Sequence, residues 1–338
     1  MFNIITSENE AQWNEIIQSM NDFDFYHLLE YHRLDKSGDP LLLHYSDETS
    51  AFALPVILRP VEGTEYNDIT SIYGYSGPLS NTNRPDRESV KQFHKNLLHF
   101  FDENSVVSVF SRLHPLFPVQ EQILEGIGNT LNTGTTVAID LNLPENEQRW
   151  QYSHSLKNDI NRLKRKKLMV KEAKTKAEIE AFVDIYTETM NRVHASKIYF
   201  FNNDYFFRFL ETLPSVLYLA YYEEKIISGS LFTDCNGIIQ PHLSATRNDY
   251  LCLSPLKYVW DQIRLYSIEK RKNYMHLGGG FGGGRDTLFE FKAQFSHLHF
   301  SFKTWRYIHN REAYDKLVYD KWQNDLPDSS FFPLYRLG

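Results

Sequence analysis

The order of apolar segments is the feature of this sequence that most restricts its possible folds. In the first half of the chain, three stretches rich in β-branched and aromatic residues predict strands; a helical apolar pattern and a further strand follow. These segments span 41–45, 50–60, 69–78, 86–101 and 105–115. Three antiparallel strands joined through one crossover helix to another strand form a mixed α/β unit.

The second half repeats this order in nearly the same lengths, although side-chain identity between the halves is negligible. Its three strands, helix and closing strand span 216–222, 226–233, 238–246, 255–270 and 274–280. Extra helices are expected before them, at 147–167, 177–194 and 203–213. The repeated order predicts two copies of one α/β unit.

The boundary between the copies is expected in a polar, turn-rich stretch at 141–147. This gives an N-terminal domain at 1–143 and a C-terminal domain at 144–338. The length of 338 residues suits two domains of ordinary size.

Charge and composition exclude several classes of protein. A net charge of −7 argues against general electrostatic attraction to nucleic acid, and no DNA partner is expected. Cys235 and Cys252 have no metal-ligand spacing, so no metal site is expected. The N-terminus lacks the pattern of a signal peptide, and no stretch approaches 18 uninterrupted apolar residues. We therefore expect a cytoplasmic protein without a transmembrane segment, and peripheral contact with a membrane stays open.

Six glycines fall between Gly278 and Gly284, directly before a predicted helix. The run contains neither a P-loop nor a dinucleotide-binding fingerprint, so it is either a flexible turn or a place where substrate approaches the backbone closely. The helix can begin at Asp286 or Thr287, and Thr287 and Glu290 have the spacing of a capping box. Free N–H groups at its start could hold an anion.

Lys292 lies inside an apolar stripe of that helix. Leu288, Phe291, Lys292 and Phe295 share one face by their spacing. Burial of an ammonium is costly unless something negative meets it. One interpretation is that the stem packs on the rings while the ammonium reaches water. The other is a cation aimed at a developing negative charge, such as a tetrahedral oxyanion.

Several stretches together resemble the Fem-type peptidyltransferases and their acyltransferase relatives, which include the peptidoglycan bridge-forming aminoacyltransferases. "YMHLGGG" (274–280) and "DTLFEFKAQFS" (286–296) resemble the closing segment of that family. The other similar stretches, in the family's order, are "FYHLLEYHRL" (25–34), "YGYSGPL" (73–79), "VFSRLHPLF" (109–117), "SLKNDINRLKRKK" (155–167) and "HLSAT" (242–246). The resemblance implies an α/β fold of two tandem GNAT-like domains, each with a mixed, mostly antiparallel sheet flanked by helices.

The resemblance also implies an activity and its centre. It implies an N-acyltransferase that passes an aminoacyl or acyl group to an amino group of a cell-envelope precursor, either a peptidoglycan stem peptide or an amino sugar. Phe291 and Lys292 match the pair at the family's reaction centre, where Lys292 would stabilise charge as the amine attacks a carbonyl. No bound cofactor is expected. The donor co-substrate is either aminoacyl-tRNA, with tRNA as a partner, or acyl-CoA.

Two departures keep the donor open. No run of heptads could form the long helical arm of some bridge-forming members, which weakens a role for tRNA. The loop "RNDYLCLSP" (247–255) has no glycine where a CoA-dependent enzyme usually wraps the pyrophosphate, which weakens CoA binding. The alternatives are an acyl-CoA-dependent N-acetyltransferase of a small amine and a non-catalytic binding module.

The remaining candidate residues have structural alternatives. Those expected to bind substrate are Tyr75, Gly77, Tyr199, His242, Ser244, Gly279, Gly280 and Arg285. Lys157 and Arg162 are expected to contact phosphate, although a charge run such as 157–176 is usually a solvated helix face. The aromatic residues at 199–209 are mostly expected to pack between helices, and the default interpretation of His242 is a histidine with its hydrogen bonds satisfied within the sheet.

Overall fold

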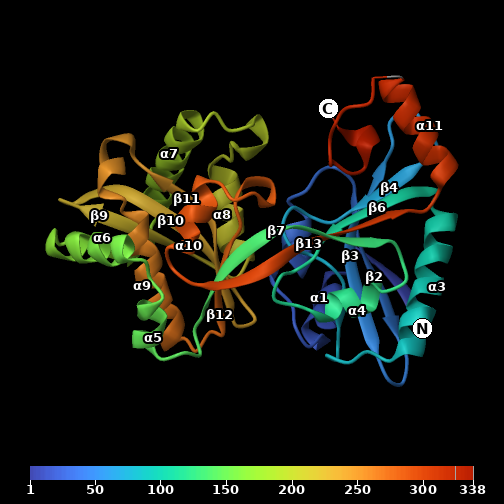
Figure 1. Ribbon diagram of the computed structural model, residues 1–338, viewed down its shortest axis with the longest axis horizontal. Helices are drawn as coiled ribbons and strands as arrows, with labels where there is room; N and C mark the ends of the chain where they lie inside the picture. The colour runs from blue at the N-terminus through green and yellow to red at the C-terminus, as the bar shows by residue number, and fades with distance from the viewer. Residues whose placement is uncertain (324, 338) are drawn as a thin grey trace. The chain divides into compact units, whose positions relative to one another are not determined.

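The chain folds into two compact units, described here from a computed structural model that covers residues 1–323 and 325–337 (Figure 1). Unit 1 consists of residues 1–134 and 301–338, and unit 2 of residues 135–300. This division differs from the expected boundary after residue 143 in two ways. Residues 135–143 belong to unit 2, and the chain returns to unit 1 for its last segment.

Unit 1 contains the first copy of the repeated pattern. Its strands in chain order are β1 (Phe2–Thr6), β2 (Asp39–Ser46), β3 (Ala51–Pro60), β4 (Asn67–Thr70), β5 (Leu79–Ser80) and β6 (Val106–Arg112). Its helices are α1 (Glu10–Ser19), α2 (Leu29–His32), α3 (Arg87–Glu103), α4 (Val119–Leu124) and α11 (Arg311–Trp322). Strands β2, β3 and β4 are antiparallel neighbours, and β6 lies parallel to β4 after the crossover helix α3.

Helix α3 shows how the sequence positions that crossover. The carboxylate of Asp86 accepts hydrogen bonds from the backbone N–H groups of Glu88 and Ser89 and thereby caps the helix. The apolar residues at helical spacing are all buried against the sheet: Val90, Phe93, Leu97, Phe100 and Phe101. The predicted helix is therefore confirmed together with the face that it buries.

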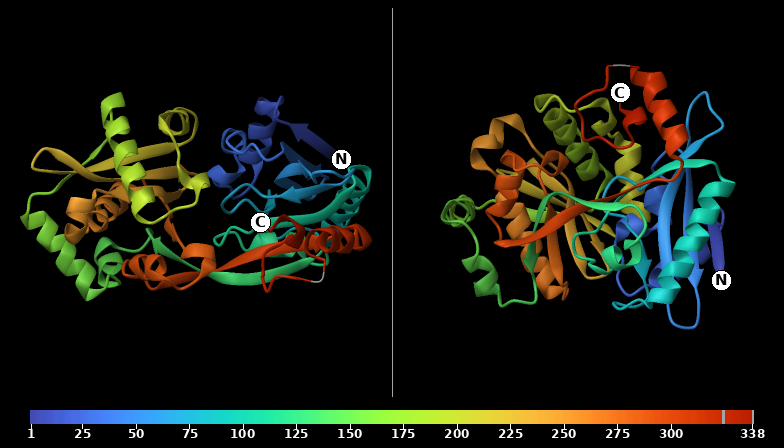
Figure 2. Two further views of the ribbon diagram at one scale, coloured as in Figure 1. Left: turned by 90° about the horizontal axis from the view of Figure 1, so that it is seen from above. Right: turned by 45° about the vertical axis from the view of Figure 1, so that its right-hand side comes forward.

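Unit 2 contains the second copy. Its strands are β8 (Met169–Glu172), β9 (Ser215–Tyr222), β10 (Lys225–Cys235), β11 (Ile238–Thr246) and β12 (Tyr274–Gly278). Its helices are α5 (Glu145–Trp150), α6 (His154–Arg165), α7 (Lys176–Arg192), α8 (Asn203–Thr212), α9 (Leu256–Glu269) and α10 (Thr287–Ala293). Strands β9, β10 and β11 are antiparallel neighbours, and β12 lies parallel to β11 after α9. Figure 2 shows α7 and α9 on opposite faces of this sheet.

The strand that follows each copy pairs with the last strand of the other copy. Strand β7 (Asn129–Asp140) follows the first copy, and its second half pairs with β12 in unit 2. Strand β13 (Leu298–Ile308) follows the second copy and pairs with β6 in unit 1. This exchange is the reason that residues 135–143 and 301–338 change units.

The expected mixed, mostly antiparallel α/β class is confirmed, with local differences. The predicted strand at 69–78 is shorter, because β4 ends at Thr70 and an irregular segment follows. The predicted helix at 147–167 is two helices, since Ser153 interrupts it and caps α6 by accepting a hydrogen bond from the N–H of Leu156. Among the described residues, no helix is both long and apolar enough to cross a bilayer.

Candidate functional site

Helix α10 carries Lys292 and begins at a cap that differs from the expected one. The Asp286 carboxylate accepts hydrogen bonds from the N–H groups of Phe289, at 2.9 Å, and Phe281, at 2.8 Å. Asp286 is therefore the N-cap, and Thr287 and Glu290 do not form the predicted capping box. The hydrogen bond from Phe289 does most to lower the pKa of Asp286. An anionic side chain thus occupies the helix start that the sequence left available for a bound anion.

The ammonium of Lys292 is held inside unit 2. Its Nζ atom donates a hydrogen bond to the backbone oxygen of Gly279 at 2.5 Å. Burial lowers its pKa from 10.5 to about 8, while the charge of Asp286 acts weakly in the opposite direction. With this pKa the group remains mostly protonated at neutral pH. An ammonium has three N–H donors, and within the described chain Lys292 uses one of them, on Gly279.

Lys292 shares its face of α10 with two aromatic residues, Phe291 and Phe295, but not with every residue that the spacing predicted. Phe295 is fully buried, and Phe291 packs against Trp260 with ring centroids 5.1 Å apart. Leu288, in contrast, is exposed, and Phe289 is buried in its place. The stripe therefore narrows to Phe291, Lys292 and Phe295, because the first turn of α10 directs Phe289 toward the core.

The backbone of the glycine-rich segment packs closely against other backbone atoms at Gly279 and Gly280. A Cβ atom on Gly280 would lie 2.2 Å from the backbone oxygen of Gly284, and one on Gly279 would lie 2.7 Å from that of Thr135. Both distances are shorter than any side chain tolerates. Gly279 and Gly280 therefore have a structural reason to be glycine, and Gly279 also supplies the oxygen that holds Lys292.

The two central strands of unit 2 diverge beside this segment. Within the described chain, β11 and β12 pair only at Ile238 with Tyr274 and at Ile239 with Met275. Farther along, β11 pairs with β10 across a bulge after Leu231. The diverging part of β11 contains the candidates His242 and Ser244, both partly buried.

His242 and its neighbours form a polar and aromatic cluster. The Nε2 atom of His242 lies 2.9 Å from the hydroxyl of Tyr205, and its ring stacks on Phe209 at 4.6 Å. Burial lowers the pKa of His242 to about 3, so the ring is neutral at pH 7 and a weak base. The hydroxyls of Ser244 and Ser230 lie 2.6 Å apart. Tyr205 is the neighbour that the sequence hypothesis did not assign to His242.

The other candidates of unit 2 lie at separate places. The backbone oxygen of Tyr199 accepts a hydrogen bond from the hydroxyl of Tyr186. Lys157 donates to the backbone oxygen of Trp150 at 2.9 Å, and Arg162 pairs with Asp159 at 2.9 Å. Lys157 and Arg162, which were expected to contact phosphate, therefore both have partners within the chain.

Arg285 is exposed, with its guanidinium carbon 5.5 Å from the ring centroid of Phe289. Arg285 lies directly before the cap of α10, in the same turn region as the glycines. Among the candidate residues, Arg285 is therefore the exposed cation that lies next to the glycine-rich segment, whose Gly279 accepts the hydrogen bond of Lys292.

Tyr75 and Gly77 belong to unit 1. Tyr75 packs edge-on against Tyr26 and Phe302, with ring centroids 5.6 and 5.4 Å apart. A Cβ atom on Gly77 would lie 2.4 Å from the side-chain oxygen of Gln120. The candidate list thus divides between the two units: Tyr75 and Gly77 belong to unit 1, and the other candidates belong to unit 2.

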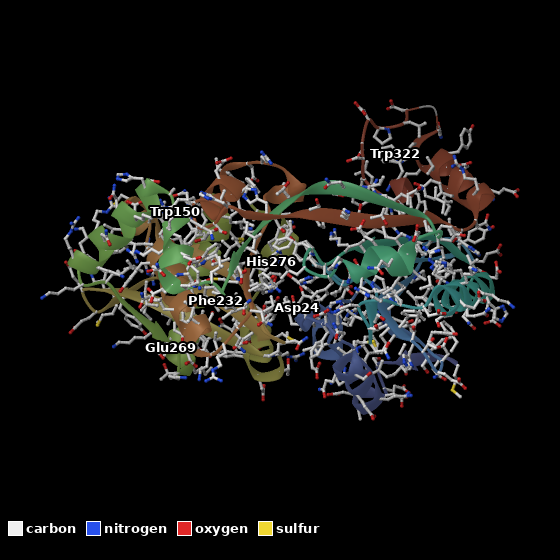
Figure 3. The ribbon with its side chains drawn as sticks, turned by 60° about the horizontal axis from the view of Figure 1, so that its bottom comes forward. Asp24, Trp150, Phe232, Glu269, His276 and Trp322 are labelled. Atoms are coloured by element: carbon white, nitrogen blue, oxygen red, sulfur yellow. The ribbon has the colours of Figure 1, made fainter. Side chains whose placement is uncertain are left out.

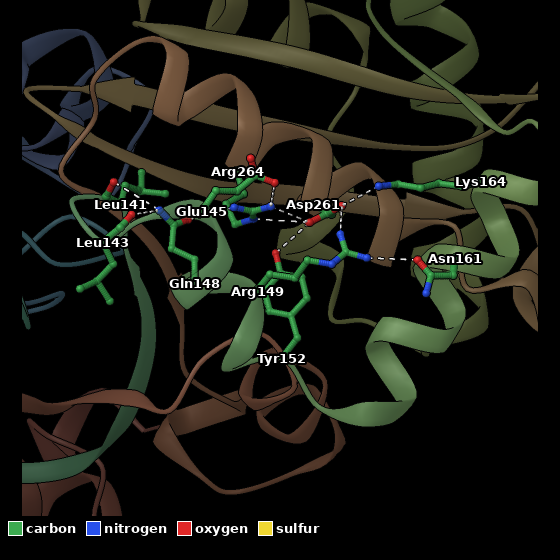
Figure 4. Close-up of polar contacts among 10 residues, drawn as sticks. All are labelled: Leu141, Leu143, Glu145, Gln148, Arg149, Tyr152, Asn161, Lys164, Asp261 and Arg264. Carbon is green, nitrogen blue, oxygen red and sulfur yellow. Dashed lines mark hydrogen bonds and ion pairs between the residues drawn. The ribbon is translucent and has the colours of Figure 1, made fainter.

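A buried polar network in unit 2 was missed by the sequence analysis (Figure 4). Asp261 and Arg264 of α9 are fully buried, and the Arg264 guanidinium donates to the Asp261 carboxylate at 3.2 Å. The hydroxyl of Tyr152 also donates to Asp261, at 3.0 Å, and the Tyr152 ring lies 5.5 Å from that of Phe295. Gln148 accepts a further hydrogen bond from Arg264. The network connects α9 with the segment before α6. The available signal was an aspartate and an arginine three positions apart in α9, next to the apolar residues Trp260 and Ile263.

Phe232, His276 and Trp150 of unit 2 are labelled in Figure 3. Phe232 and His276 are fully buried, whereas Trp150 is 73% exposed. His276 precedes the glycine-rich segment on β12, and its Nδ1 atom lies 3.3 Å from the side-chain oxygen of Gln240 on β11. This contact continues the link between the two strands just beyond their last backbone pair.

Comparison with known proteins shows which solved structures have a similar fold. No protein-family model matches the chain, and no curated protein matches it either. Among solved structures, the chain is similar to FemX, with a TM-score of 0.72 and 11% identity over 94% of this chain and 99% of that one. It is also similar to L-PGS from Bacillus licheniformis, with a TM-score of 0.59 and 14% identity over 90% and 93% of the two chains.

A third similar structure is the C-terminal domain of a putative lysylphosphatidylglycerol synthetase from Agrobacterium fabrum. Its TM-score is 0.57, with 12% identity over 92% of this chain and 98% of that chain. The chain therefore shares the fold of these three structures, which is the Fem-like fold that the sequence resemblance implied.

Proposed function

We propose that this protein is an acyltransferase whose reaction centre is Lys292. It transfers an aminoacyl or acyl group to an amino group of a cell-envelope precursor, either a peptidoglycan stem peptide or an amino sugar. The observation that carries the proposal is the partly buried ammonium of Lys292, fixed on the oxygen of Gly279 beside Phe291 and Phe295. Similarity of fold to FemX supports the class of acceptor.

The proposed reaction needs a positive charge where a carbonyl oxygen becomes negative. The nitrogen of the acceptor amine attacks the carbonyl carbon, and the electrons of the C=O bond move to oxygen. The two N–H groups of Lys292 not used by Gly279 donate to that oxyanion. The intermediate then collapses, the C–N bond is retained, and the donor leaves as an alkoxide or thiolate that takes up a proton. The attacking nitrogen loses its own proton to a base in the site.

Aminoacyl-tRNA and acyl-CoA are both proposed as donors, and no bound cofactor is required. The loop before α9 forms a 3-10 helix at Asn248–Leu253 that contains no glycine. This geometry supports the argument against a CoA pyrophosphate loop at that position. We also propose that the protein contacts the membrane surface, because such contact would bring a lipid-linked acceptor within reach.

The test offers charged tRNA and acyl-CoA donors side by side with a stem-peptide precursor and an amino sugar, and products are identified by mass spectrometry. Lys292→Met should lower turnover by about 100- to 1000-fold, the usual effect of losing one oxyanion donor. Lys225→Met, at an exposed position of β10, is the matched control for charge. Turnover of the Lys292→Met variant within a few-fold of wild type, with the fold intact, would refute the role of Lys292. Absence of product with every donor would favour the non-catalytic module.

A further inference from the structure

Unit 1 contains a cavity that the proposed reaction does not use. Its volume is about 460 Å³, within the usual range for small-ligand sites of roughly 300 to 1,000 Å³. The start of β7, the end of β13, the first residue of α11 and Phe332 form its walls. Three parts of the chain that are distant in sequence, near residues 128–131, 306–311 and 332, thus meet at one concave surface.

The charge of this cavity is positive and incompletely neutralised. Arg306 and Arg311 line it, and no aspartate or glutamate does. Arg306 donates from Nη1 to the backbone oxygen of Ser330 at 2.9 Å, but its buried Nε atom has no hydrogen-bond partner. Within residues 1–323 and 325–337, no carboxylate lies within ion-pair distance of Arg306. Burial accordingly lowers the pKa of Arg306.

Arg311 adds further free donors. Its Nε atom pairs with Asp315 at 2.7 Å, and its remaining N–H groups make no hydrogen bond in the described part of the chain. A guanidinium carries five N–H donors in a planar fork, which matches the oxygens of a phosphate group. Two guanidinium groups line this cavity and no carboxylate does, so the cavity favours a ligand with a phosphate group over an uncharged ligand.

The wall beside Arg306 is aromatic. The guanidinium carbon of Arg306 lies 5.7 Å from the ring centroid of Phe332. The Phe332 ring in turn stacks on Tyr314 at 5.8 Å, with an angle of 20° between the planes. A flat apolar surface next to two guanidinium groups suits a ligand that joins a planar ring to an anion.

We infer that this cavity binds a small organic phosphate whose planar group packs against Phe332 and whose phosphate oxygens meet Arg306 and Arg311. The competing explanation is that Arg306 only anchors the segment around Ser330 and Phe332 to β13. Arg311 separates the two explanations, because it lines the cavity without contacting Ser330.

Titration calorimetry of the full chain with phenyl phosphate, uridine monophosphate and inorganic phosphate tests the inference. We expect saturable binding of at least one organic phosphate, tighter than that of inorganic phosphate. Arg306→Gln and Arg311→Gln should each weaken it by roughly tenfold or more. Arg87→Gln, at the exposed first residue of α3, should leave it unchanged.

Three results would overturn the inference. The first is no saturable heat with any of the three probes. The second is equal affinity in wild type and Arg311→Gln. The third is a loss of affinity in Arg306→Gln alone, accompanied by a lower Tm, which would assign Arg306 a purely anchoring role.

Discussion

Replacement of Lys292 by methionine should stabilise unit 2 at neutral pH although it removes the proposed reaction centre. Methionine has a similar length and no charge, so it can follow the path of the stem past Phe291 and Phe295. In the wild-type protein, the ammonium of Lys292 is largely removed from water, and within residues 1–323 and 325–337 it donates one hydrogen bond, to the backbone oxygen of Gly279. Residues retained for chemistry often carry such a cost.

The magnitude follows from the pKa of Lys292. Its fall from 10.5 to about 8 corresponds to an unfavourable contribution of about 3 kcal/mol for the charged form in the folded state. Loss of the hydrogen bond to Gly279 works against the variant by about 1 kcal/mol. We therefore expect the free energy of unfolding to be higher in Lys292→Met by about 1 to 2 kcal/mol at pH 7.

The sign of the pH dependence is fixed by linkage. Between pH 8 and 10.5 the unfolded lysine holds a proton that the folded lysine has released, so wild-type stability rises with pH across this window. The variant lacks this contribution. The difference in free energy of unfolding should therefore change by about 2 to 3 kcal/mol in favour of wild type between pH 7 and pH 10, so the variant is no longer the more stable protein at pH 10.

Urea denaturation of both proteins at pH 7 and pH 10 measures this change, because groups that titrate alike in the two proteins cancel from the difference. Lys225→Met serves again as the control for the loss of one exposed lysine. A difference between wild type and Lys292→Met that stays constant over this pH range would refute the buried-ammonium argument. A variant already less stable than wild type at pH 7 would refute it as well.

Two further predictions concern other parts of unit 2, the buried Asp261–Arg264 pair and the glycine-rich segment. Asp261→Asn should lower the free energy of unfolding by about 3 to 5 kcal/mol, because it leaves the fully buried guanidinium of Arg264 without its main counter-charge; a loss below about 1 kcal/mol in chemical denaturation would contradict this. Gly280→Ala should destabilise the protein by about 1 to 3 kcal/mol and reduce turnover, because its Cβ would collide with the Gly284 oxygen. Gly284→Ala, whose Cβ would lie 3.3 Å from the nearest atom, is the control, and equal effects of the two substitutions would show that the collision is unimportant.

Much of the fold could be predicted from local patterns. The α3 stripe and the strand–strand–strand–helix–strand order of each copy come from residues close in sequence, and the structure confirms both. Strand β13 alternates apolar residues at Leu298, Phe300 and Phe302, so a signal existed there that the analysis did not use. Strand β7 begins with polar and threonine-rich sequence, which gives little indication of a strand.

The candidate site also has features that local sequence could predict and features that it could not. The spacing of Phe291, Lys292 and Phe295 identified a lysine in an aromatic setting, because a helix face is a local property. It could not identify Gly279 as the hydrogen-bond partner, since that contact depends on how the glycine-rich segment folds back over α10. Nor could it join His242 to Tyr205, which come from β11 and α8.

The sequence by itself determined that two similar α/β units would form and that one lysine would lie among aromatic rings. Both follow from periodicity, which depends on the near neighbours of each residue. Only the tertiary structure decided that the strand following each copy pairs within the other unit. It also decided that Asp286 rather than a bound anion occupies the start of α10, and that Asp261 neutralises Arg264 inside unit 2. These features depend on pairings between segments far apart in the chain, and local residue preferences do not specify which distant segment a strand or a charge will meet.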